Sequence, residues 1–180
     1  KPFYLLRHGE TDWNKRNIIM GAKNIPLNEN GFKQAYQVAD SLQNIPYASI
    51  ATSPLMRART TAQILNQKIL KPITVIDNLR EGSWGIMEGK HKSEALMNDW
   101  RSGKLIEGAE SFLLFKERAL KGINQALELP GPVLIIAHGG LCWAIQDALG
   151  LPFVDVHNCT LVQYTPPKKL NYKDFNNVIC

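Results

Sequence analysis

The chain has 180 residues, 44% of them hydrophobic and 21% charged. This composition is typical of a globular protein and excludes disordered, collagen-like and coiled-coil classes. The length predicts a single domain, which we place at residues 1–165, followed by a C-terminal tail at residues 166–180. No apolar run approaches the roughly 18 residues that a membrane span needs, so we expect a cytoplasmic protein that has no membrane partner.

The net charge of +5 arises in the first half of the chain. Residues 1–90 contain 12 Lys and Arg against 7 Asp and Glu, whereas residues 91–180 contain 9 of each. This bias suits an anionic ligand, but there is no clustered basic stripe, so we expect no nucleic-acid partner. Cys142, Cys159 and Cys180 form no CxxC pair, which argues against a disulfide framework and a thiolate zinc site. The sequence leaves the oligomeric state open.

Short apolar runs alternate with amphipathic stretches along the chain. The pattern predicts strands at 3–6, 48–52, 73–76, 133–137 and about 159–164. Helical periodicity predicts helices at 30–43, 91–102 and 110–128, one that follows Gly140 and extends through Leu149, and one that begins at Ser53 and Pro54, where Ser53 serves as N-cap. Three glycines make residues 80–90 a loop. The alternation predicts a three-layer α/β/α fold with a largely parallel central sheet.

Basic side chains follow three of the predicted strands. Arg7 and His8 follow the first strand, Arg57 lies in the first turn after the second, and His138 follows a late strand. Ligands of open α/β sheets bind at the carboxyl ends of the strands, so we expect these four side chains to converge. Taken alone, His138 is better explained as a core histidine and Arg57 as a surface residue. However, a cation in a first helical turn costs about 0.3 to 1 kcal/mol, which favours a bound anion.

A tetrahedral phosphoryl group is the anion that fits this set. Arginine binds its oxygens two at a time, and the N–H groups at helix starts add further donors. The sequence contains no GxxxxGK[ST] loop, no GxGxxG and no acidic pair spaced for magnesium. Its four histidines show no HxxxH spacing. The sequence therefore predicts a phosphate site that uses no metal and no other cofactor.

Five motifs in order resemble those of the histidine phosphatase superfamily, also called the phosphoglycerate mutase-like family. The first, LRHGETDWN at 6–14, is similar to the RHGET signature of that family. The others are GAKNIPLNENG at 21–31, TSPLMRARTTA at 52–62, LREGSWGIMEG at 79–89 and VLIIAHGG at 133–140. Together they cover nearly the whole chain.

The resemblance implies a phosphohistidine intermediate. It implies His8 as the nucleophile and Glu81 as the acid that protonates the leaving alkoxide and then activates water. It also implies a phosphate pocket made of Arg7, Arg57 and a positively charged His138, with Asn14 and the N–H of Gly139 as further substrate contacts. Without the resemblance, Glu81 and Asn14 are ordinary loop and turn residues.

The resemblance leaves three functions to compare. We expect a metal-independent phosphomonoesterase acting on a small phosphorylated substrate; the alternative is a cofactor-dependent phosphoglycerate mutase. Mutases of this family carry Arg-His-Tyr-Gly after the acid, where this chain has Gly82-Ser83-Trp84-Gly85. A regulatory module without catalysis ranks third because the catalytic set is intact. The identity of the phosphate ester stays open.

Further residues are expected to lie around the predicted site. The segment 90–110 contributes five candidate recognition residues: Lys90, His91, Lys92, Arg101 and Lys104. Met20 stands where relatives often carry a polar residue, so a polar substrate contact is not expected there. Trp143 stands where many relatives carry a basic residue, and we expect it to pack within its helix.

Overall fold

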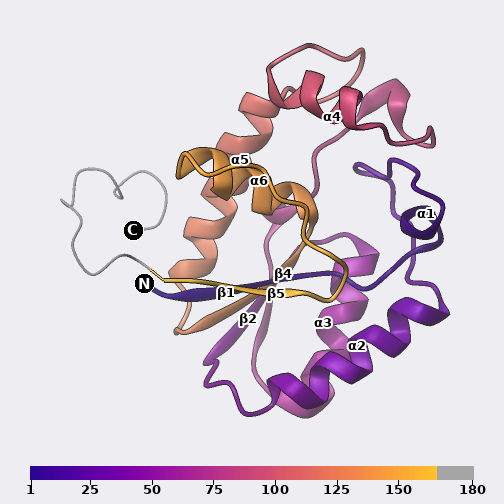
Figure 1. Cartoon of the computed structure of the whole chain (residues 1–180). Coiled ribbons are helices and arrows are strands. Elements are labelled where there is room, and N and C mark those ends of the chain that lie inside the picture. The colour runs from indigo at the N-terminus through magenta and orange to yellow at the C-terminus, as the bar shows by residue number, and fades with distance from the viewer. Residues whose placement is uncertain (166–180) are drawn as a thin grey trace.

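The computed structural model describes residues 1–165 and has a five-stranded sheet at its centre (Figure 1). The expected tail at 166–180 lies outside the described residues. The strand order is β3-β2-β4-β1-β5. The strands are β1 (Phe3–Arg7), β2 (Ser49–Thr52), β3 (Ile73–Val75), β4 (Val133–Ala137) and β5 (Leu161–Tyr164).

The first four strands run parallel, and β5 is antiparallel to β1. Arg7, the last residue of β1, pairs in register with Ala137, the last residue of β4. The residues that follow these two strands therefore emerge side by side at one edge of the sheet. The expected largely parallel sheet is confirmed.

Helices cover both faces of the sheet, with α2 and α3 on one face and α5 and α6 on the other (Figure 1). The helices are α1 (Asp12–Lys15), α2 (Glu29–Leu42), α3 (Met56–Ile69), α4 (Glu94–Arg101), α5 (Phe112–Leu127) and α6 (Gly139–Ala148), with 3-10 turns at Asp77–Leu79 and Gly85–Met87. The expected three-layer α/β/α fold is confirmed. None of the helices in residues 1–165 is both long and apolar enough to cross a membrane.

Two helix starts differ from the sequence prediction. The short helix α1 was not expected; a capping box, in which Thr11 and Asn14 bond each other's backbone N–H groups, stabilises it. The helix α3 begins at Met56 with Leu55 as N-cap, so the prediction of Ser53 as N-cap is wrong. The hydroxyl of Ser53 instead contacts His138 from another strand end.

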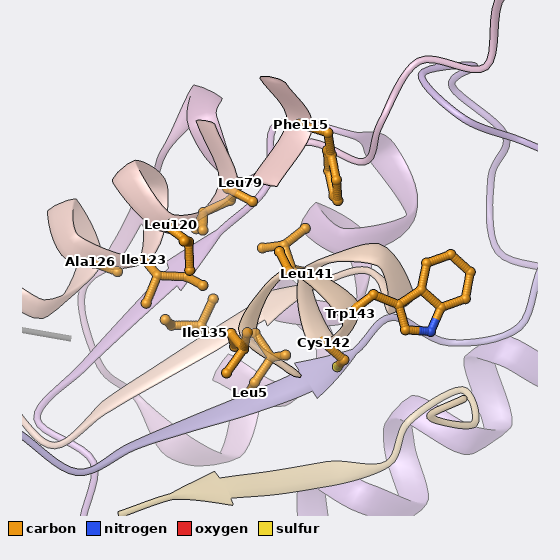
Figure 2. Close-up of a cluster of buried hydrophobic side chains, with 14 of the residues drawn as sticks. Leu5, Leu79, Phe115, Leu120, Ile123, Ala126, Ile135, Leu141, Cys142 and Trp143 are labelled. Carbon is orange, nitrogen blue, oxygen red and sulfur yellow. The ribbon is translucent and has the colours of Figure 1, made fainter. Parts of the chain in front are cut away.

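Alternating side chains of the central strands divide the core into two clusters. Leu5 and Ile135 point into the cluster that α5 and α6 cover, together with Leu141 and Ile123 (Figure 2). Leu6 belongs to the second cluster, beneath α2 and α3. Because both faces of β1 and β4 are buried, these strands are almost continuously apolar until the chain reaches the polar residues at their ends.

Candidate active site

The two histidines that follow β1 and β4 lie next to each other. Their ring centroids are 5.2 Å apart, and the planes of His8 and His138 are inclined by 60°. Both side chains are buried. This contact follows directly from the parallel register of β1 and β4, which brings two segments 130 residues apart to the same edge of the sheet.

A cavity of about 90 Å³ opens at this edge. Six of the seven site residues predicted from the sequence line it: Arg7, His8, Asn14, Arg57, Glu81 and Gly139. The seventh, His138, is fully buried and does not reach the cavity wall. The structure thus brings all seven together, with His138 packed against the ring of His8 rather than forming part of the lining.

The His8 ring is held in one orientation by its own backbone turn. Nδ1 lies 2.7 Å from the carbonyl oxygen of Gly9, which can only accept, so Nδ1 carries the proton and Nε2 keeps its lone pair. The N–H of Gly9 donates to Oγ1 of Thr61, which in turn donates to the carbonyl of Arg57. A Cβ at position 9 would lie 2.6 Å from the carbonyl oxygen of Gly31, so only glycine fits this turn.

Both imidazoles are neutral in the free protein at pH 7. Burial lowers the pKa of His8 well below its usual value, and the charges of Arg57 and Arg7 lower it further. Burial also lowers the pKa of His138, as do Arg57 and the neighbouring His8. Two nearby guanidinium groups thus oppose a further positive charge in the free protein, and the expected positive charge on His138 when a phosphoryl group is bound stays a prediction.

Arg57 is completely buried, and loop carbonyls hold it in place. Its guanidinium donates to the carbonyl oxygens of Lys23 at 2.7 Å and Gly21 at 2.9 Å. Burial lowers its pKa to about 10, so it stays charged at neutral pH. Its Nε is buried and has no hydrogen-bond partner within residues 1–165. A buried cation with a spare donor favours a bound anion.

Arg7 presents a second guanidinium to the cavity. It donates to the carbonyl oxygen of Val156 at 2.5 Å, and its Nε also lacks a partner in the described part of the chain. Burial lowers the pKa of Arg7, while Glu81 and Asp155 oppose this shift. The two guanidinium groups provide the fork-shaped donors that bind phosphate oxygens.

The carboxylate of Glu81, a residue of the loop 80–90, contacts the first turn of α6. One carboxylate oxygen accepts the N–H of Gly140 at 3.1 Å, and the other accepts the N–H of Gly82 at 3.1 Å. Each oxygen keeps a further lone pair for a ligand. The carboxylate is thus fixed at the cavity wall. From the residues alone, without the family resemblance, Glu81 was an ordinary loop carboxylate.

Comparison with known proteins identifies the family. The model of the histidine phosphatase superfamily (branch 1) matches residues 3–179. The chain belongs to the histidine phosphatase superfamily. It is 34% identical to the uncharacterized phosphatase PhoE of Bacillus subtilis over 144 residues, 78% of this chain and 73% of that protein. It is also 35% identical to the probable phosphoglycerate mutase GpmB of Cronobacter sakazakii over 162 residues, 83% of this chain and 75% of that one.

Solved structures of the superfamily share the fold. A mycobacterial glucosyl-3-phosphoglycerate phosphatase superposes with a TM-score of 0.78 at 26% identity, over 91% of this chain and 89% of that chain. TTHB049 from Thermus thermophilus gives a TM-score of 0.78 at 27% identity, over 94% of this chain and 96% of that one. The protein is therefore an enzyme of the histidine phosphatase superfamily, and the expected family and fold are confirmed.

Asn14 combines a structural role with a place in this superfamily site. Its Oδ1 accepts from the backbone N–H and the hydroxyl of Thr11, and it lies 3.3 Å from Nδ2 of Asn158. The side-chain oxygen is therefore engaged within the protein. Asn14 still lines the cavity, so its amide N–H₂ group is the part that can donate to a ligand.

The site also contains residues that sequence reasoning missed. Asp155 and Val156 reach the cavity from the loop after α6, which has no periodic pattern to mark it. Trp143, expected to pack within its helix, is nearly buried and also lines the cavity, and its indole N–H donates to Asp155 at 3.1 Å. Met20 lies in the same wall.

The expected recognition residues of the segment 90–110 divide into two groups. Lys92 lines the active-site cavity, and Arg101 lines a neighbouring one. Lys90, His91 and Lys104 line neither of these cavities. Within residues 1–165 no group of three His, Cys, Asp or Glu side chains is placed to hold a metal ion.

Proposed function

We propose that the protein is a metal-independent phosphomonoesterase that hydrolyses a small phosphorylated metabolite through a phosphohistidine on His8. One observation carries this proposal. A neutral His8, whose Nε2 lone pair is free, lies in a cavity that the guanidinium groups of Arg7 and Arg57 also line. An unprotonated nucleophile next to two cations is suited to attack a phosphate ester dianion.

In the first step, Nε2 of His8 forms a bond to phosphorus as the bond to the ester oxygen breaks. Arg7 and Arg57 stabilise the charge on the transferring oxygens, and the N–H of Gly139 at the start of α6 adds a donor. Glu81, in its protonated form, gives its proton to the leaving alkoxide. The products of this step are the free alcohol and the phosphorylated His8.

In the second step, water attacks phosphorus and Nε2 of His8 leaves. Glu81, now a carboxylate, accepts the proton of the attacking water, so the enzyme returns to its starting state. The two steps together convert a phosphate ester and water into an alcohol and inorganic phosphate. Splitting the displacement in this way replaces one difficult step by two easier ones.

A phosphoglycerate mutase activity is the second candidate, favoured by relatives such as the probable mutase of Cronobacter sakazakii. The segment after Glu81 supports hydrolysis instead. A Cβ at Gly82 would lie 3.1 Å from the Trp100 ring and 3.2 Å from Phe115, so this position has little room for a basic side chain. Trp84, two residues on, gives the cavity an apolar wall. The site thus lacks charges there to retain a bisphosphate.

Comparing phosphate release with isomerisation tests the proposal. With 3-phosphoglycerate and its bisphosphate, inorganic phosphate should form faster than 2-phosphoglycerate, and activity should survive EDTA. If isomerisation is faster than phosphate release at saturating substrate, the phosphatase proposal is wrong and the protein is a mutase. Loss of activity in EDTA that one added metal restores would contradict metal independence.

Trapping the intermediate tests the nucleophile separately. Wild-type enzyme quenched in alkali should carry an alkali-stable, acid-labile phosphoryl group, and the His8→Ala variant should carry none. Turnover by wild type without any trapped phosphoenzyme, at quench times shorter than one turnover, would remove His8 from this role.

A further inference from the structure

A second cavity of about 290 Å³, here called the distal cavity, adjoins the active-site cavity beside α4. Lys92, Met97, Trp143 and Asp155 line both cavities, so residues of the shared wall face each of them. Part of this wall is an ion pair between Lys92 and Asp155, with 3.1 Å between Nζ and Oδ2. A solvent-exposed ion pair contributes at most about 1 kcal/mol of stabilising free energy, so a ligand can displace it at little cost.

Arg101, at the end of α4, gives the distal cavity a fixed guanidinium. Its Cζ lies 4.9 Å from the ring centroid of Trp143 and 4.7 Å from that of Phe153. One terminal nitrogen donates to Oδ1 of Asn98 at 2.6 Å. These contacts hold the group in one orientation, so it loses little conformational entropy when it binds a ligand.

The charge of Arg101 is not matched by a carboxylate. Within residues 1–165 Arg101 takes part in no ion pair, and its buried Nε has no hydrogen-bond partner. Asp155 is already engaged by Lys92 and by the indole N–H of Trp143. An oriented guanidinium with spare donors fits an anionic group.

One further carboxylate lines the distal cavity. Glu94 lies in the first turn of α4, seven residues before Arg101, which corresponds to about 10 Å along the helix axis. Salt screens exposed charges over about 8 Å at physiological ionic strength, so Glu94 only weakens the attraction of an anion to Arg101. The N-terminal dipole of α4 offsets the charge of Glu94 further.

The wall shared by the two cavities is partly apolar. Met97 and the Trp143 ring lie in it beside the Lys92–Asp155 ion pair. These two side chains offer contacts to carbon atoms. A substrate that spans the two cavities therefore passes an apolar surface with its middle portion.

We propose that the distal cavity binds the far end of the substrate alcohol, and that this end carries an oxyanion, such as a carboxylate, which Arg101 binds. The substrate class is a phosphate monoester with an apolar body and a second anionic group. This proposal rests on the proposed function, because the phosphoryl end must lie at His8 for the far end to reach α4.

Benzylphosphonates test the distal cavity without any turnover, because their carbon–phosphorus bond is not hydrolysed. One series carries a carboxylate at the end of a para alkyl chain of increasing length, and the matched series ends in a methyl group. Isothermal titration of wild type should give at least one carboxylate that binds about 10-fold tighter than its match, as expected of a charge-assisted hydrogen bond. Arg101→Gln should remove most of this preference, and Arg101→Lys should keep part of it.

Two further variants complete the test. Lys104→Gln removes an exposed positive charge that lines neither cavity, and it should keep the wild-type preference. Glu94→Gln should strengthen binding of the carboxylates, whereas weaker binding would contradict an anionic ligand. Equal affinity of both series in wild type, or a preference that survives Arg101→Gln, overturns the proposal. Absence of phosphate ester hydrolysis overturns only the proposed function, since phosphonate affinities do not depend on it.

Discussion

Oγ of Ser53 lies 2.8 Å from Nε2 of His138, although the two residues are 85 positions apart. The same hydroxyl oxygen accepts the N–H of Leu55 at 3.2 Å, so its proton is available for the imidazole. Nδ1 of His138 is buried and has no partner among the described residues. The contact thus orients the His138 ring, which packs against the ring of His8, and this makes Ser53 a positioning residue for His138.

Removing the Ser53 hydroxyl should therefore impair catalysis through His138. We expect Ser53→Ala to lower kcat/KM about 10-fold, the effect of one lost hydrogen bond of about 1.4 kcal/mol. The loss should be small in a His138→Ala background, because the partner is then absent. Equal losses in both backgrounds would mean that Ser53 acts on the fold and not through His138.

Stability should fall as the pH drops below 6.5. Both His8 and His138 have a lowered pKa in the folded protein, so below 6.5 the unfolded chain binds protons that the folded protein does not. The free energy of unfolding then decreases with falling pH, with a slope approaching about 2.7 kcal/mol per pH unit for two such groups. Urea denaturation between pH 5 and 7 measures this slope.

Histidine variants identify the source of that slope. His8→Gln and His138→Gln should each remove about half of it, since each removes one group that titrates differently in the two states. A slope unchanged in both buried variants would show that the histidines are not the source.

Glu81→Gln should affect poor leaving groups most. Glutamine cannot supply a proton, so phosphorylation of the enzyme by an alkyl phosphate should slow about 100-fold. p-Nitrophenol departs as a stable anion, so p-nitrophenyl phosphate should lose much less rate. Rapid-quench measurement of phosphoenzyme formation isolates this step from the attack of water. Equal losses of this rate for both esters would argue that Glu81 does not protonate the leaving group.

Gly140→Ala should disturb the same carboxylate from the helix side. A Cβ at position 140 would overlap Oε1 of Glu81 and lie 2.9 Å from Cζ of Phe115. The carboxylate must then leave its place, and the variant should show the same leaving-group dependence as Glu81→Gln. The double variant should be no slower than Glu81→Gln alone. Additive losses would place the effect of Gly140 elsewhere.

The sequence by itself determined the elements of the fold and the ends of the central strands. The apolar runs that become β1 and β4 end where Arg7 and His138 follow, and the helices α2 and α5 lie within one to two residues of their predicted bounds. These features are local, because apolar runs and helical periodicity depend on neighbours along the chain. The motifs around His8 and Arg57 made the candidate site recognisable before any geometry was known.

Only the tertiary structure decided how these residues act. The hydrogen bond between Ser53 and His138 joins the ends of two strands. The sequence pattern predicted Ser53 as a helix N-cap, whereas its hydroxyl contacts a histidine of the site. The neutral state of His8 depends on burial and on the charges of Arg57 and Arg7; Arg7 precedes His8 in the chain, but only the fold brings Arg57 near it. Asp155 reaches the cavity from a loop without periodicity. Long-range contacts and burial depend on how the elements pack, and this cannot be predicted from the hydrophobic pattern of neighbouring residues.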